Sequence, residues 1–133
     1  MVSSSILGRS ILVVEDEELL AEAIKIKLDS NGYKVLVART VDQAWDYLHD
    51  IGPVDVIWLD HFLPGKTGDE LLAAVRKDPA LKDIPVYLVT NSINPEIVNK
   101  YVKLGIQQYY TKALTRLEKI VSMIEADLQG YTK

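Results

Sequence analysis

The stretch Val54-Asp-Val-Ile-Trp-Leu-Asp-His-Phe-Leu-Pro-Gly-Lys-Thr-Gly68 contains the change from strand to helix that decides the fold. Its first six residues are mostly apolar and rich in β-branched side chains, as in a short strand buried on both faces. The strand ends at an acidic residue, Asp60, and a loop with proline and glycine follows it. The pattern then predicts a helix over 68–77, which ends before Pro79. A buried strand followed by a loop and a helix is the repeating unit of a parallel sheet.

The same unit occurs five times along the chain. Strand-like runs are predicted at about 11–14, 33–38, 54–59, 85–89 and 108–111. Helical patterns follow them at about 17–30, 41–48, 68–77, 95–104 and 114–128. Thr40 and Asn94 stand where helix N-caps are expected, and Pro95 suits a first helical position. This alternation predicts an α/β fold, with an open, doubly wound parallel sheet of five strands and helices on both faces.

Composition limits the class of protein. The 133 residues fit one domain, and 48% hydrophobic with 26% charged residues is typical of a soluble globular chain. Cysteine is absent, which excludes disulfides and thiolate metal sites. With a net charge of −4 and no basic stripe, direct nucleic-acid binding is not expected, and no apolar run is long enough to span a membrane. We expect a cytoplasmic protein with a flexible lead-in at 1–9, one domain at 10–129 and a C-terminal tail at 130–133.

Polar side chains stand at the carboxyl ends of four of the five predicted strands. Glu15 and Asp16 follow the first strand, the third strand ends at Asp60, the fourth ends at Thr90, and Lys112 follows the fifth. In parallel α/β sheets these strand ends meet at one edge, where ligands bind. The five side chains are therefore expected to form one site.

Carboxylates that meet in this way repel one another, by roughly 4 kcal/mol for unit charges about 4 Å apart at an effective dielectric near 20. A divalent cation removes that cost, and Mg²⁺ prefers carboxylate and water oxygens. One carboxylate can also act as a nucleophile, because aspartyl phosphates are a known class of covalent intermediate. Phosphoryl transfer mainly requires positioning and charge neutralisation, which Mg²⁺, Lys112 and the Thr90 hydroxyl would supply. The pattern predicts phosphoryl chemistry at Asp60 with Mg²⁺ as cofactor.

Four sequence blocks, taken in order, resemble a known family. The blocks are Val13-Val-Glu-Asp-Glu17, Trp58-Leu-Asp-His-Phe-Leu-Pro-Gly-Lys-Thr-Gly68, Val89-Thr90 and Tyr109-Tyr-Thr-Lys112. In order and spacing they are similar to the receiver (CheY-like) domains of two-component response regulators. The resemblance covers about Ser10 to Leu128. It implies the flavodoxin-like (βα)5 fold, with a five-stranded parallel sheet in the order 2-1-3-4-5.

The resemblance implies roles for the residues around Asp60, which matches the phosphoacceptor. Glu15 and Asp16 match the acidic pair that holds Mg²⁺, and Phe62 matches the position whose backbone carbonyl is a further metal ligand. Asp60 itself completes the expected metal set. Such a domain is a signalling phosphoacceptor and not an enzyme in the usual sense, although it supports its own phosphorylation and dephosphorylation.

Three further residues match the family's response to phosphorylation. Thr90 matches the switch hydroxyl, Lys112 the phosphate-binding lysine and Tyr109 the aromatic residue that changes rotamer. The resemblance implies that phosphorylation changes the surface of the fourth helix, fifth strand and fifth helix, including Tyr101 and Lys103. The expected partners are a histidine kinase or histidine phosphotransfer protein as donor, and an output protein or domain on that surface. A homodimer is left open.

The sequence departs from the family pattern at three positions. Glu15 replaces the more usual aspartate and is expected to reach the metal directly or through water. Ala113 replaces the proline that usually follows the lysine across a cis bond. Because a cis bond to a residue other than proline costs about 2.5–4 kcal/mol, we expect a trans bond there or a strained cis bond. Asn91 stands where a small residue is usual and is expected to restrict access to Asp60.

Other interpretations of these residues stay open. A degenerate receiver that acts only as a protein-interaction module is the main alternative. A flavin-binding electron carrier of the same fold is disfavoured, because the acidic residues after the first strand would repel a phosphate. A phosphatase with an aspartyl nucleophile would usually carry a second aspartate at the position of Phe62. Trp58 is expected to fill the core, His61 to be exposed in its loop, and His49 to lie on the surface.

Overall fold

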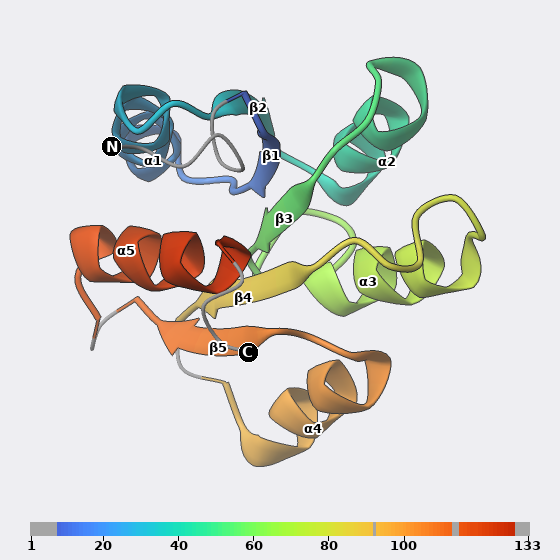
Figure 1. The fold of residues 1–133 in the computed structure, drawn as a ribbon. Coiled ribbons are helices and arrows are strands. Elements are labelled where there is room, and N and C mark those ends of the chain that lie inside the picture. The colour runs from blue at the N-terminus through green and yellow to red at the C-terminus, as the bar shows by residue number, and fades with distance from the viewer. Residues whose placement is uncertain (1–7, 92, 113–114, 130–133) are drawn as a thin grey trace.

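The computed structural model describes residues 8–91, 93–112 and 115–129 of the chain. Its strands are β1 (Ser10–Val14), β2 (Lys34–Ala38), β3 (Val56–Leu59), β4 (Val86–Thr90) and β5 (Gln108–Thr111). A helix follows each strand, and these are α1 (Glu18–Ser30), α2 (Val41–Asp50), α3 (Gly68–Lys77), α4 (Pro95–Leu104) and α5 (Leu117–Leu128). Figure 1 shows the strands side by side at the centre, with the helices around them. The predicted alternation of strands and helices is confirmed.

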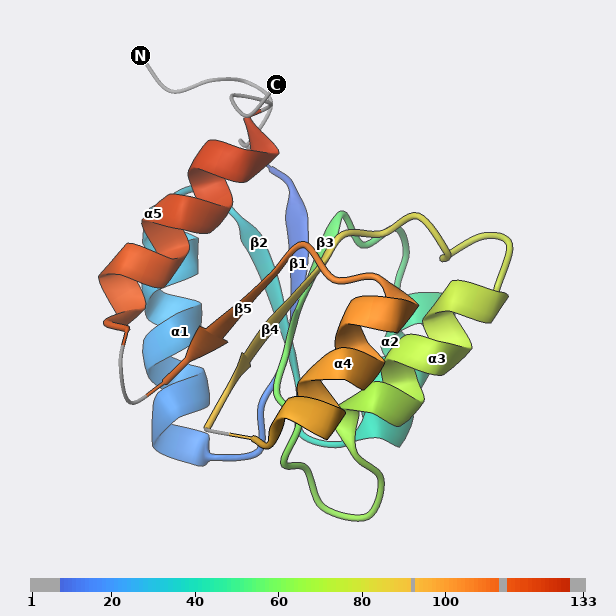
Figure 2. The same cartoon turned by 90° about the horizontal axis from the view of Figure 1, so that it is seen from below.

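The five strands form one parallel sheet in the order β2-β1-β3-β4-β5. Helices α1 and α5 cover one face of the sheet, and α2, α3 and α4 cover the other (Figure 2). This is the doubly wound, flavodoxin-like arrangement that the sequence predicted. Because all strands run the same way, their carboxyl ends lie along one edge, where this class of fold binds ligands.

The central strands are buried because helices cover both of their faces. Every residue of β3 and β4 is buried, as are the last four residues of β1, whereas the edge strands β2 and β5 are only partly buried. Alternate side chains enter two separate cores. Leu12 and Val14 pack under α2, α3 and α4, while Ile11 and Val13 pack under α1 and α5. The continuous apolar runs of the sequence therefore reflect two cores that share one sheet.

Two helices begin at the caps that the sequence predicted. The side chains of Thr40 and Asn94 each accept a hydrogen bond from the backbone N–H three residues later, and Pro95 lies in the first turn of α4. These caps satisfy backbone donors that a first helical turn leaves unpaired. The fourth strand differs slightly from its predicted range of 85–89, because it runs from Val86 to Thr90. Thr90 is the last residue of this strand, as the site prediction placed it.

Helix α4 is attached to the rest of the protein by few buried side chains. Tyr101 is the only fully buried residue among those of α4, all of which the structure describes. At the C-terminal end of α4, the Arg76 guanidinium of α3 donates hydrogen bonds to the carbonyl oxygens of Leu104, at 3.0 Å, and Gly105, at 2.6 Å. The same guanidinium donates to two carbonyl oxygens of the loop before β4, each at 2.9 Å. Arg76 therefore fixes one end of α4 to α3 and to that loop.

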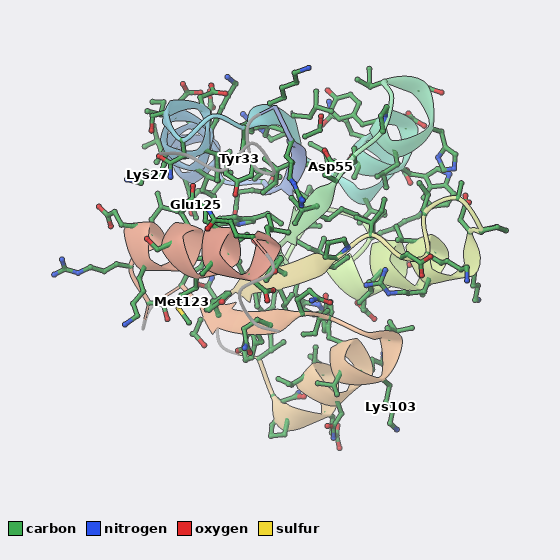
Figure 3. The ribbon with its side chains drawn as sticks, in the orientation of Figure 1. Lys27, Tyr33, Asp55, Lys103, Met123 and Glu125 are labelled. Atoms are coloured by element: carbon green, nitrogen blue, oxygen red, sulfur yellow. The ribbon has the colours of Figure 1, made fainter. Side chains whose placement is uncertain are left out.

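On the other face of the sheet, polar contacts between described residues help to hold α5. The Tyr87 hydroxyl of β4 donates to the Asp127 carboxylate, and the Asn31 amide donates to Glu125 at 2.8 Å. Tyr33 and Glu125 lie close together where α1 and α5 meet (Figure 3). Burial, with the charge of Glu125, raises the pKa of Tyr33 to about 12. The buried Tyr33 hydroxyl has no hydrogen-bond partner among the described residues.

Some of the predicted features fall outside the described residues. They are most of the lead-in, residues 1–7, the tail at 130–133, and the peptide bond between Lys112 and Ala113. Within the described ranges, no helix combines the length and the apolar character needed to cross a membrane.

Candidate functional site

Four of the predicted site residues come together at the carboxyl edge of the sheet. Backbone hydrogen bonds continue the parallel ladder one residue beyond the strands. Glu15 N–H donates to the end of β2 at 2.9 Å, Asp60 N–H to the end of β1 at 3.1 Å, and Lys112 N–H to the Thr90 carbonyl at 2.9 Å. These bonds hold the side chains of Glu15, Asp60, Thr90 and Lys112 in one layer.

Asp60 is buried at the centre of this group, with 3% of the residue exposed. Its Oδ1 atom accepts a hydrogen bond from the Thr90 hydroxyl and a longer one, at 3.3 Å, from the backbone N–H of Phe62. Its Oδ2 atom accepts a hydrogen bond from the Lys112 ammonium at 3.0 Å. Both carboxylate oxygens thus face donors, with a hydroxyl on one side and a cation on the other.

Lys112 also joins Asp60 to Glu15. Its Nζ atom lies 2.7 Å from Glu15 Oε1, and Glu15 Oε2 accepts a hydrogen bond from the Glu17 backbone N–H at 3.0 Å. Burial raises the pKa of the Glu15 carboxyl; the bonds from Lys112 and Glu17 oppose this rise, and the Asp60 charge adds to it. Burial alone would lower the pKa of Lys112, but its bonds to Glu15 and Asp60 outweigh burial and raise it. The two carboxylates and the ammonium form one buried ion cluster.

The other two predicted metal ligands are placed differently. The Asp16 side chain is exposed, directly after Glu15, and 49% of Phe62 is exposed. Across the part of the chain that the structure describes, no three histidine or acidic side chains gather in a group that could hold a metal ion. The metal set of Glu15, Asp16, Asp60 and the Phe62 carbonyl stays a prediction, of which the structure brings Glu15 and Asp60 together.

His61 is not the exposed loop residue that the sequence suggested, because only 7% of it is exposed. Its Nδ1 atom lies 2.7 Å from the Tyr101 hydroxyl of α4 and 3.6 Å from a carboxylate oxygen of Asp69. Tyr101, which was expected on the changing surface, is fully buried. Burial, with the charges of Asp69 and Asp60, raises the pKa of the Tyr101 hydroxyl, so this group keeps its proton.

These two predictions were wrong because the contact joins residues 40 positions apart, which no local spacing reveals. One signal for Tyr101 was present in the sequence. Ile97, Tyr101 and Leu104 recur at the spacing of an inward-facing helix stripe, and all three pack in the core under α2, α3 and α4. His61 carried no such signal, since it follows the end of a strand.

Three elements hold the chain at His61, directly after Asp60. The His61 N–H donates to Thr90 Oγ1 at 3.3 Å, and its carbonyl accepts from the N–H of Gly68, at the start of α3, at 3.1 Å. The ring makes the third contact, to Tyr101 of α4. A side chain at Gly68 would force this backbone to shift, because a Cβ atom would lie 2.3 Å from the Asp60 backbone oxygen and 2.7 Å from the Tyr101 hydroxyl.

The remaining residues singled out in the sequence lie around this centre. Trp58 is 1% exposed and fills the core under α1 and α5, as predicted. Tyr109 is half-buried on β5 and packs against the core on the opposite face. His49 is exposed, as predicted, and Asn91 is also exposed. The rotamer change of Tyr109 and the effect of Asn91 on access to Asp60 stay predictions.

The sequence matches the model of the response regulator receiver domain over residues 11–125. The chain belongs to this family. Receiver domains are signalling phosphoacceptors of two-component systems and not classical enzymes. The chain is 33% identical over 122 residues to the phosphate regulon transcriptional regulatory protein PhoB of Pseudomonas aeruginosa, an alignment that covers 92% of this chain and 52% of that protein. This receiver domain therefore spans about half the length of the curated relatives that it matches.

Solved structures of response regulators share the fold of this receiver domain. The Mn²⁺-bound form of Rcp1 is 30% identical, with a TM-score of 0.78 over 89% of this chain and 92% of that chain. The phosphorylated cyanobacterial phytochrome response regulator RcpA is 29% identical, with a TM-score of 0.77 over 90% of each chain. The resemblance to CheY-like receiver domains and the flavodoxin-like fold are confirmed.

Proposed function

We propose that this receiver domain accepts a phosphoryl group on Asp60, from a phosphohistidine of a histidine kinase or a phosphotransfer protein, with Mg²⁺ as cofactor. The buried Asp60 carboxylate supports this most directly, because the Thr90 hydroxyl binds one of its oxygens and the Lys112 ammonium binds the other. Phosphoryl transfer depends mainly on positioning and on neutralising charge, and these contacts supply both. The phosphorylated form of RcpA supports the same chemistry in this family.

In the proposed step, an Asp60 oxygen attacks the phosphorus atom of the donor. The new O–P bond forms as the bond from phosphorus to the donor imidazole nitrogen breaks, and the imidazole keeps that electron pair. Lys112 and the Thr90 hydroxyl then donate hydrogen bonds to phosphoryl oxygens. Because the group carries about −1.5 to −2 charges, it attracts both donors strongly. Attack by water on the same phosphorus would later return Asp60 to its free form.

The oxygen donors around Asp60 fit a Mg²⁺ ion. The carboxylates of Glu15 and Asp60 both lie within hydrogen-bond distance of one nitrogen, so they are close enough to share a cation. Hard oxygen donors of this kind are the ligands that Mg²⁺ prefers. We propose Glu15, Asp16, Asp60 and the Phe62 backbone carbonyl as its ligands. Bound Mg²⁺ would neutralise charge on the transferred phosphoryl group, and the Mn²⁺-bound form of Rcp1 supports a divalent cation in this family.

Phosphorylation is proposed to shift the domain between two packings. Thr90 moves toward the phosphoryl group, and Tyr109 turns into the space that Thr90 leaves. The surface of α4, β5 and α5 changes as a result, and Figure 3 shows Lys103 extending outward from α4 on this surface. We propose that an output protein or domain, or a second copy of the chain, binds there in the cytoplasm, without direct contact between this domain and nucleic acid.

Mass spectrometry after treatment with acetyl phosphate and Mg²⁺ tests the proposal. The wild-type protein should gain one phosphoryl group, and Asp60→Asn should gain none. Asp55→Asn is the matched control, because Asp55 lies at the opposite end of β3, where its carboxylate accepts a hydrogen bond from Ser10 N–H at 2.8 Å (Figure 3). This variant should be modified as the wild type is.

Each part of the proposal has its own contrary result. Modification of Asp60→Asn would place the phosphoryl group on another residue. Uptake that EDTA leaves unchanged would contradict the role of Mg²⁺. A wild-type protein that takes up no phosphoryl group would favour the alternative, in which the domain is a degenerate receiver and acts only as a protein-interaction module.

A further inference from the structure

The hydrogen bond between His61 and Tyr101 joins the phosphoacceptor segment to α4 inside the protein. We propose that Tyr101 is a positioning residue of the Asp60 site, and that this bond carries the phosphorylation state of Asp60 to α4. This role rests on the proposed phosphorylation of Asp60. Besides the expected movement of Thr90 and Tyr109, it gives the protein a second, buried connection between Asp60 and the changing surface.

A continuous run of hydrogen bonds leads from Asp60 to the helix. Thr90 Oγ1 donates to Asp60 Oδ1 and accepts from the His61 N–H at 3.3 Å. The ring of the same histidine reaches the Tyr101 hydroxyl at 2.7 Å. When Thr90 turns toward a phosphoryl group, the acceptor of the His61 N–H moves away. A change at Asp60 therefore acts on the backbone of the residue whose ring is bonded to α4.

Tyr101 has little freedom to absorb such a change. Its ring stands edge-on to the His61 ring, with centroids 5.6 Å apart and an interplanar angle of 78°. Its hydroxyl packs against the start of α3, where a Cβ atom on Gly68 would lie 2.7 Å away. Because Tyr101 is the only fully buried residue of α4, the segment after Asp60 sets the position of the helix at this point.

The surface contact beside this bond is weaker. The Asp69 carboxylate in the first turn of α3 lies 3.6 Å from His61 Nδ1 and, through its other oxygen, 3.6 Å from the Lys100 ammonium of α4. The Lys100 side chain is 68% exposed, and exposed ion pairs contribute little to stability. The buried bond to Tyr101 is therefore the stronger connection between the site and α4.

Amide hydrogen exchange of α4 tests this role in Tyr101→Phe, which loses the hydroxyl and keeps the ring. Tyr87→Phe is the matched control, because Tyr87 is equally buried and its hydroxyl donates to Asp127 under the opposite face of the sheet. Exchange is measured before and after phosphorylation with acetyl phosphate and Mg²⁺. In wild type and Tyr87→Phe, phosphorylation should change the exchange of α4. In Tyr101→Phe, α4 should exchange about three- to tenfold faster before phosphorylation, as expected for one net hydrogen bond, and should not change further afterwards.

The outcomes separate the inference from the proposed function. If the Tyr101 hydroxyl had only a structural role, its loss would speed exchange by the same factor in unphosphorylated and phosphorylated protein. A Tyr101→Phe protein whose α4 exchange still changes on phosphorylation would therefore overturn the inference. Phosphorylated wild-type protein with unchanged exchange in α4 would overturn the inference and the proposed change at the surface of α4, but it would leave phosphoryl transfer to Asp60 standing. Wild-type protein that takes up no phosphoryl group would overturn both.

A second measurement needs no change at Tyr101. The chain has two histidines, so the imidazole ¹⁵N signals of wild type can be assigned to His61 by comparison with His49→Gln. At constant pH, the Nδ1 signal of His61 should move when Asp60 is phosphorylated, because its hydrogen bond to Tyr101 changes. A stationary Nδ1 signal in fully phosphorylated protein would overturn the inference.

Discussion

Replacing Gly68 by alanine should damage both the stability and the phosphoacceptor site, although alanine is ordinarily the better helix residue. Gly68 is the first residue of α3, and a Cβ atom there would lie 2.3 Å from the backbone oxygen of Asp60 and 2.7 Å from the Tyr101 hydroxyl. Real Cβ atoms essentially never come closer than 3.0 Å to non-bonded atoms elsewhere in the chain. Because the first of these oxygens belongs to the backbone, it cannot rotate away. Either α3 or the backbone at Asp60 must move.

The size of the loss follows from two opposing effects. At an open helix position, a change from glycine to alanine gains up to about 1 kcal/mol. Overpacking that forces a backbone shift costs about 1–3 kcal/mol. We therefore expect Gly68→Ala to lower the free energy of unfolding by about 1–2 kcal/mol, which changes the ratio of folded to unfolded protein by roughly tenfold.

Urea unfolding followed by tryptophan fluorescence measures the stability, and acetyl phosphate uptake measures the site. Gly52→Ala is the control, because a Cβ atom at Gly52 has no neighbour within 4 Å, but φ is 130°. This variant carries only backbone strain, so it should lose stability and keep normal uptake at Asp60. Gly68→Ala should lose both. A Gly68→Ala protein that is as stable as wild type, and phosphorylated as fast, would refute the close contact between position 68 and the Asp60 backbone oxygen.

Urea unfolding also tests three further changes. Tyr33→Phe should raise the free energy of unfolding by about 1 kcal/mol, since it removes a buried hydroxyl that has no partner among the described residues. Because folding raises the pKa of Tyr33 from 10.0 to about 12, the unfolded chain loses this proton first; wild type should lose stability between those values, and Tyr33→Phe should lose less. Without added metal, Lys112→Met should lower the free energy of unfolding by about 3 kcal/mol near neutral pH, because the buried carboxylates of Glu15 and Asp60 lose their counter-ion. This loss of stability should become smaller as the pH falls toward the raised pKa of Glu15, because the folded form protonates the Glu15 carboxylate more readily than the unfolded chain does. A loss that does not change with pH would contradict the buried cluster. Thr40→Ala should lower the free energy of unfolding by about 1 kcal/mol, because α2 loses its N-cap, and should leave phosphoryl uptake unchanged. A loss of uptake in this variant would refute a role limited to capping.

The sheet and its reactive edge could be predicted because both depend on short-range patterns. A strand covered by helices on both faces must be apolar throughout, and this marked β3 and its end at Asp60. Once the strands are taken as parallel, their carboxyl ends have to share an edge. The meeting of Asp60, Thr90 and Lys112 followed from that topology without any knowledge of side-chain torsions.

The contacts within the site could not be predicted in the same way. Sequence spacing assigns a side chain to a face or an edge, but not to one neighbour among several on that edge. It did not show that Lys112 would lie between Glu15 and Asp60, or that Asp16 would point into solvent beside them. The burial of His61 depends on a helix that begins more than thirty residues later in the chain, beyond the reach of any periodicity.

The four hydrogen bonds of Arg76 make the two ends of α4 unequal. Because its C-terminal end is fixed to α3 and to the loop before β4, any rotation of the helix would pivot near Leu104. Tyr101 lies about one turn from that point and Pro95 about three times as far, at 1.5 Å of rise per residue. A small displacement at Tyr101 would grow about threefold at the start of the helix. A partner that binds the first turn of α4 would therefore meet a much larger displacement of the helix than a partner that binds at Lys103, next to the fixed end.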